Sequence, residues 1–115
     1  MNKSIIQSYK QILKELQQKD LQDSKAKQIK QTLQKDISKI KEIIQQTLEN
    51  KKKHESIPHL TPVQKRIIQT IYQSVLEIHN KYIEIANEIL NYLQTPLSEE
   101  LKYQKLEEIE RKINE

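Results

Sequence analysis

The 115-residue sequence contains no glycine, no cysteine, no tryptophan and no phenylalanine. Glycine makes up roughly 7% of an average protein, so about eight glycines would be expected in a chain of this length. Glycine is the residue that most readily adopts the positive φ of tight turns and of phosphate-binding loops. Its absence therefore excludes the usual glycine-rich nucleotide-binding folds, in which the backbone must approach the phosphates closely.

The absence of cysteine excludes a disulfide framework, a thiolate zinc site and a thiol nucleophile. Long hydrophobic runs are missing as well, since none approaches the ~18 residues of a membrane-spanning helix. At the N-terminus, Asn2, Lys3 and Ser4 precede alternating polar and apolar residues and not the apolar stretch of a signal peptide. From these features we expect an intracellular, cytoplasmic protein without a membrane span.

Positive charge is in excess, and it is unevenly distributed along the chain. Residues 1–57 contain 13 lysines and 7 acidic residues, a net charge of +6, whereas residues 58–115 contain 7 basic and 9 acidic residues, a net charge of −2. Such asymmetry can steer a protein toward nucleic acid or an anionic surface. It can equally make two halves of one bundle attract each other. We favour the second interpretation because the lysines are interleaved with acidic residues.

Apolar residues recur at three- and four-residue steps in four segments, which is the pattern of amphipathic helices. The first stripe, from Ile5 to Leu16, restarts out of phase at Ala26. This predicts a helix break, with Asp20 or Asp23 as the N-cap of the second helix. One continuous helix is the alternative, because no glycine or proline enforces the break. The sequence predicts an all-α, elongated antiparallel bundle of about four helices, in the order short, long, long, short, around a central long hairpin. We expect one domain, residues 1–115, with helices at residues 3–18, 23–52, 61–94 and 97–113.

The third segment begins with the clearest local signal in the sequence. Thr61, Pro62 and Gln64 match an N-cap threonine, a proline at the first helical position and a glutamine at the third. The apolar residues that follow cover about 200° of arc, which is wider than the seam of a two-stranded coiled coil. We expect this helix to be the centre of the fold. Either its neighbours cover the whole arc, or part of it is left for a partner chain.

The residues that could carry chemistry do not form a catalytic or metal-binding set. His54 and His59 have no companions to complete the ligands of a zinc ion, and we interpret them as linker residues. His79 falls within the apolar arc, where we expect a boundary histidine bonded to a neighbouring helix. A further helix N-cap is expected at Thr95 or Ser98. The sequence predicts a non-enzymatic protein with no catalytic residue, no metal and no cofactor.

Lysine supplies the main functional lead. Only two arginines occur, so sequence-specific reading of guanine is not expected, whereas nonspecific contact with phosphates is an alternative to protein binding. The candidate contacts with a partner or with phosphate are Lys39, Lys41, Lys51, Lys52, Lys53, Lys65 and Arg66.

Two functional hypotheses follow from these patterns. The first is a helical protein–protein interaction module, such as an adaptor, assembly subunit, chaperone or immunity factor, that binds a protein partner or forms a homo-oligomer. Its size, basic charge and four-helix pattern are similar to those of the small immunity proteins that protect bacteriocin producers, a likeness of fold that no residue motif carries. The alternative is an accessory nucleic-acid-binding bundle that uses a lysine-rich face of the second helix and the loop after it.

Overall fold

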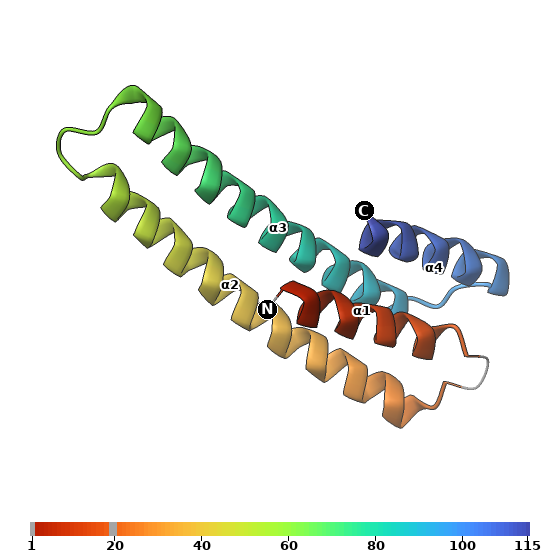
Figure 1. The fold of residues 1–115 in the computed structure, drawn as a ribbon. Coiled ribbons are helices and arrows are strands. Elements are labelled where there is room, and N and C mark those ends of the chain that lie inside the picture. The colour runs from red at the N-terminus through yellow and green to blue at the C-terminus, as the bar shows by residue number, and fades with distance from the viewer. Residues whose placement is uncertain (1, 19–20) are drawn as a thin grey trace. The chain divides into compact units, whose positions relative to one another are not determined.

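The structure is a computed structural model that describes residues 2–18 and 21–115. It contains four helices, α1 (Asn2–Leu16), α2 (Asp23–Glu55), α3 (Pro62–Gln94) and α4 (Glu99–Asn114) (Figure 1). Within these described ranges there is no β-strand. The predicted all-α fold, with two long helices between two short ones, is confirmed.

The chain divides into two compact units. Residues 1–36 and 84–115 form one of them, which we call the bundle unit, and residues 37–83 form the other, which we call the hairpin unit. Both long helices, α2 and α3, contribute residues to each unit. The expectation that residues 1–115 form a single domain stays a prediction.

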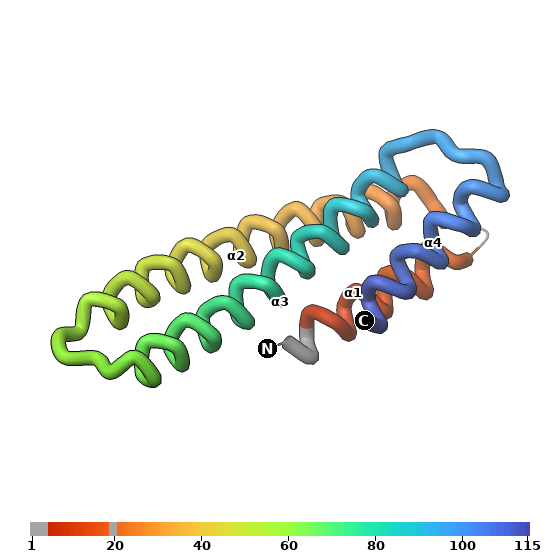
Figure 2. The backbone as a smooth tube through the Cα atoms, turned by 90° about the horizontal axis from the view of Figure 1, so that it is seen from above, coloured from red at the N-terminus to blue at the C-terminus, as the bar shows by residue number. Residues whose placement is uncertain are grey.

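The bundle unit is built from α1, the first part of α2, the last part of α3, and α4. Its helices α1 and α4 lie side by side in both views, with Cα atoms within 8 Å of each other (Figure 1, Figure 2). All four helices contribute apolar side chains to its interior, so this unit has a core of its own. The buried residues are Tyr9, Ile12, Leu13, Leu16, Ile29, Leu33, Ile85, Ala86, Ile89, Ile109 and Ile113.

Ion pairs at the edge of this core join neighbouring helices of the bundle unit. The Nζ atom of Lys112 in α4 lies 2.9 Å from the Oε1 atom of Glu84 in α3 and also donates to the carboxylate of Glu88. Hydrogen bonds to Glu88 and then Glu84 raise the pKa of Lys112 above its usual value. A second pair, Lys25 with Glu15 at 3.3 Å, joins α2 to α1. Pairs this exposed contribute about 1 kcal/mol or less each, so they orient the helices more than they stabilise them.

The predicted break between the first two helices is confirmed. Helix α1 ends at Leu16, two residues earlier than predicted, because the amide of Gln18 turns back to the carbonyl of Glu15 at 3.3 Å. The amide of Ala26 donates to the carbonyl of Gln22, which places Gln22 just before the helix. Asp23 is therefore the first residue of α2 and not the N-cap predicted for it, and its negative charge there favours the helix N-terminus. The alternative cap, Asp20, lies outside the described residues.

The connection between α2 and α3 makes its turn without glycine. Helix α2 runs three residues further than predicted, to Glu55, since no residue that breaks helices occurs before Pro58. His59 then adopts a left-handed conformation with φ of 66°. This conformation is less favourable for a residue with a Cβ atom than for glycine. The predicted cap follows directly. The amide of Gln64 donates to the Thr61 hydroxyl at 3.1 Å, and the Thr61 amide donates to the Gln64 side chain at 3.0 Å.

Helix α4 starts two residues later than predicted, at Glu99. Of the two candidate caps, Ser98 occupies the position, and its hydroxyl accepts a hydrogen bond of 3.3 Å from the amide of Leu101. Two acidic residues, Glu99 and Glu100, fill the first turn, where they complement the partial positive charge of the helix N-terminus.

Candidate interaction surface

The hairpin unit has little interior of its own. Among its described residues, Ile40 of α2 (2% exposed) and Tyr82 of α3 (4%) are the buried apolar side chains. Near its tip, Nδ1 of His54 is hydrogen-bonded to the hydroxyl of Tyr72, and the two ring centroids lie 5.5 Å apart. Two helices can cover only one side of each other, so a hairpin with broad apolar arcs leaves part of them uncovered.

Four large apolar side chains of α3 are exposed in this unit. We call them the exposed stripe: Val63 (64% exposed), Ile67 (51%), Ile71 (56%) and Ile78 (39%). Their spacing of four, four and seven residues places them on one side of the helix. Thr70 and Ser74, which are small and polar, lie on the same side of the helix, among the apolar residues of the stripe. The stripe is about 23 Å long at 1.5 Å per residue.

The spacing of the exposed stripe continues along α3 with Tyr82, Ile85 and Ile89, each at most 4% exposed. Ile85 and Ile89 belong to the bundle unit, whose helices bury them. The same apolar pattern of α3 is therefore exposed in the hairpin unit and buried in the bundle unit. The sequence allowed two outcomes, an apolar arc that is fully covered and one that is partly exposed, and the structure has the second.

Two oppositely charged residues mark one edge of the exposed stripe. Arg66 and Glu77 are eleven residues apart, which brings them to within about 20° of each other around the helix. Both side chains are exposed. Glu77 accepts a hydrogen bond of 2.9 Å from Gln73 of the same helix. Within residues 2–18 and 21–115, no acidic side chain forms an ion pair with Arg66.

The seven candidate contact residues all belong to the hairpin unit. Lys51 is partly buried and lies 3.8 Å from Glu55, and the other six are exposed. Lys39 and Lys41 are two residues apart in α2, so their side chains leave the helix about 160° apart and do not share a face. Lys52 and Lys53 lie in the last turn of α2, where positive charge complements the helix dipole. The seven residues thus share one unit without forming one cluster.

The net charge of the chain is located in the same unit. Residues 37–83 contain eight lysine and arginine residues and four glutamates, a net charge of +4. The bundle unit contains twelve basic and twelve acidic residues and is neutral. The net charge of the chain is therefore carried by the hairpin unit, in addition to the difference between the N-terminal and C-terminal halves.

Two of the three histidines, His54 and His79, have structural partners. His54 bonds to Tyr72 and so links the two helices of the hairpin, which is more than the linker role predicted for it. The expectation that His79 bonds to a neighbouring helix is wrong. Its Nδ1 atom lies 2.7 Å from the carbonyl oxygen of Val75, one turn earlier in α3, and its ring stands edge-on to Tyr82. In the part of the chain that the structure describes, no three His, Asp or Glu side chains gather as metal ligands do.

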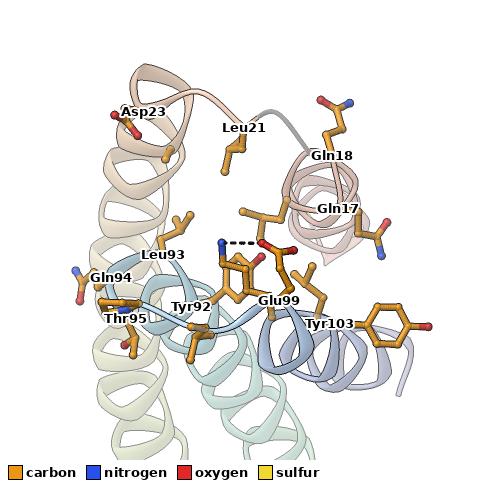
Figure 3. A pocket seen from close by; sticks show the side chains of 16 residues that line it. Gln17, Gln18, Leu21, Asp23, Tyr92, Leu93, Gln94, Thr95, Glu99 and Tyr103 are labelled. Carbon is orange, nitrogen blue, oxygen red and sulfur yellow. Dashed lines mark ion pairs between the residues drawn. The ribbon is translucent and has the colours of Figure 1, made fainter.

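An open hollow of about 750 Å³ lies in the bundle unit, where the α1–α2 and α3–α4 connections meet (Figure 3). Tyr92 forms part of its wall, and both burial and the charge of Glu99 raise the pKa of that phenol. Glu99 pairs with Lys102 at 3.8 Å, so these two charges compensate each other. The ring of Tyr103 points away from the hollow (Figure 3). Among the described residues, the charged ones that line the hollow are Asp23, Glu99 and Lys102.

No described helix combines the length and the apolar character needed to cross a lipid bilayer. Comparisons with protein-family models, with curated proteins and with solved structures find no match for this chain.

Proposed function

We propose that this chain is a non-enzymatic helical protein–protein interaction module whose docking surface is the exposed stripe of α3. One observation carries the proposal: four large apolar side chains stand exposed on one side of a helix whose later apolar residues are buried. Contiguous apolar surface of this kind is typical of interaction sites. Adaptors, assembly subunits, chaperones and immunity factors all work through such surfaces.

The strength of docking can be gauged from the size of the stripe. Covering a half-exposed isoleucine or valine gains about 1 kcal/mol, so the four residues together supply roughly 4 kcal/mol. Association costs at least about that much in lost translational and rotational freedom. Polar groups beside the stripe must therefore add to the affinity, and the complex is expected to be reversible.

Site-specific photocrosslinking tests this function. A photoreactive amino acid at position 71, in the centre of the exposed stripe, should form a covalent adduct with another polypeptide in cells of the native source. The same amino acid at position 69 is the matched control, because Gln69 is exposed on another side of the same helix. The adduct is detected as a shift in mass after irradiation.

Adducts at position 71 and not at position 69 would support docking on the stripe. The mass of the adduct also separates two kinds of partner, since a second copy doubles the mass of the chain and another protein does not. Equal labelling at both positions, or none at position 71, would contradict the proposed function.

A second candidate function is nonspecific binding of nucleic acid, and the location of the charge favours it. The entire net charge of +4 lies in the hairpin unit, together with all seven candidate contacts. A compact basic unit attracts polyphosphates by releasing their condensed counterions. In this case the lysine-rich end of α2 and the following loop, from Lys51 to Lys65, would contact phosphates and not bases.

A salt titration against duplex and single-stranded DNA and RNA examines this candidate. Binding should weaken steadily as salt rises, with a slope that reflects the number of phosphates contacted. The triple substitution Lys51/Lys52/Lys53→Glu should abolish it, whereas Lys102/Lys105→Glu in the neutral bundle unit should leave it unchanged. Absence of binding at low salt would rule the candidate out.

A further inference from the structure

We infer that the occupant of the exposed stripe is a second copy of this chain, packed antiparallel about a two-fold axis. This inference rests on the proposed function and names its partner. It follows from two midpoints along α3 that nearly coincide, that of the exposed stripe and that of the oppositely charged residues on its edge. A symmetric dimer of this kind is possible only if one surface is complementary to itself.

Self-complementarity requires that each charged residue meet its opposite after a two-fold rotation. When two copies of one helix pack antiparallel, a residue before the midpoint faces the residue equally far beyond it, along the same edge. Arg66 and Glu77 share an edge of α3 and carry opposite charges. Their midpoint lies between Ile71 and Tyr72. In a dimer centred there, Arg66 of each copy faces Glu77 of the other.

The exposed stripe gives a second position for the two-fold axis, without reference to the charged residues. The exposed stripe extends from Val63 to Ile78, and its midpoint lies between Thr70 and Ile71. This midpoint and that of the charged pair differ by one residue, or about 1.5 Å along the helix. A dimer that covers the whole stripe therefore also forms both ion pairs.

The same geometry disfavours a parallel dimer. In a parallel arrangement the two-fold axis runs along the helices, so each edge of α3 faces the opposite edge of the second copy. Arg66 and Glu77 share one edge and therefore could not pair with each other across a parallel interface. Because opposite charges at the edge of a helical seam set its orientation, the antiparallel arrangement is favoured. The small side chains of Thr70 and Ser74, within the stripe, allow close approach of the two helices.

Charge reversal gives a test with an unusual control. In Arg66→Glu both edge residues are negative, and in Glu77→Arg both are positive, so each variant repels its own copy. Mixed in equal amounts, the two variants form heterodimers in which every pair is attractive again. The double variant Arg66→Glu/Glu77→Arg restores attraction within its own homodimer.

The readout is the dimer dissociation constant of the full chain, measured by sedimentation equilibrium with circular dichroism as a check of folding. We expect each single variant to dimerise roughly tenfold or more weakly than the wild type. The equimolar mixture and the double variant should recover to within about threefold of the wild-type value. Ile71→Glu should remain monomeric in every combination.

Two results would overturn the inference. A wild-type chain that stays monomeric at all concentrations would exclude the second copy. Single variants that dimerise as well as the wild type, or that do not recover on mixing, would exclude this pairing. In either case a crosslink from position 71 to another protein would leave the proposed docking function intact, so the two failures can be distinguished.

Discussion

Replacing Ile89 by alanine is expected to lower the free energy of unfolding by about 2–5 kcal/mol. Ile89 of α3 is completely buried in the bundle unit. Truncation removes apolar surface from the core and leaves a cavity that the surrounding helices fill only in part. Chemical denaturation, followed by the circular dichroism of the helices, measures the change.

Ile71→Ala is the matched control, because it is the same substitution in the same helix at a side chain that is 56% exposed. It should change the free energy of unfolding by less than about 0.5 kcal/mol, as surface substitutions usually do. Both variants should be measured at concentrations where the chain is monomeric. If the two losses were equal, Ile71 would be as well covered as Ile89, and the stripe would not be available to a partner.

Replacing Ile109 by aspartate should release α4 from the bundle unit. The side chain of Ile109 is 1% exposed, and a carboxylate there would be buried without a partner. The cost of burying an unpaired charge is several kcal/mol, and this cost is avoided when α4 undocks and the carboxylate stays in water. Limited proteolysis with trypsin should then cleave rapidly after Lys102, Lys105 and Arg111.

Leu101→Asp provides the comparison for this variant. Leu101 also belongs to α4 but is 49% exposed, so the new carboxylate stays in water. Its cleavage pattern should match that of the wild type. Rapid cleavage of α4 in the wild-type chain would show that the helix is not held in the core, contrary to the burial of Ile109 and Ile113.

Helix positions were predictable wherever periodicity or a cap marks them. The Thr61–Gln64 cap was predicted to the residue, because the motif contains all the groups that form its two hydrogen bonds. The predicted end of α2 was less accurate, since the helix ends three residues later. A helix continues until it reaches a residue whose backbone disfavours the helical conformation. The lysine-rich segment contains no such residue, and the first one is next to Pro58.

The proposed docking surface was predictable only in part. The broad apolar arc of α3 indicated that this helix needs several neighbours, but its sequence does not record which turns receive them. Ile71 and Ile89 are the same residue type in the same helical pattern, yet one is exposed and the other is buried. The difference depends on the short helices α1 and α4, whose coverage of α3 is a tertiary property. The edge residues Arg66 and Glu77 became informative once the exposed stripe was known.

The unequal burial along α3 has a consequence for how the helix opens. Amide hydrogen exchange reports the free energy of the local opening that exposes each backbone N–H group to solvent. Amides near Ile85 and Ile89 are protected by a core that must come apart as a whole. Amides near Ile67 and Ile71 are protected by helical hydrogen bonds beside a mostly exposed surface. They should therefore exchange through smaller local openings that have a lower free energy. Within a single unbroken helix, exchange would change from local opening at one end to global unfolding at the other.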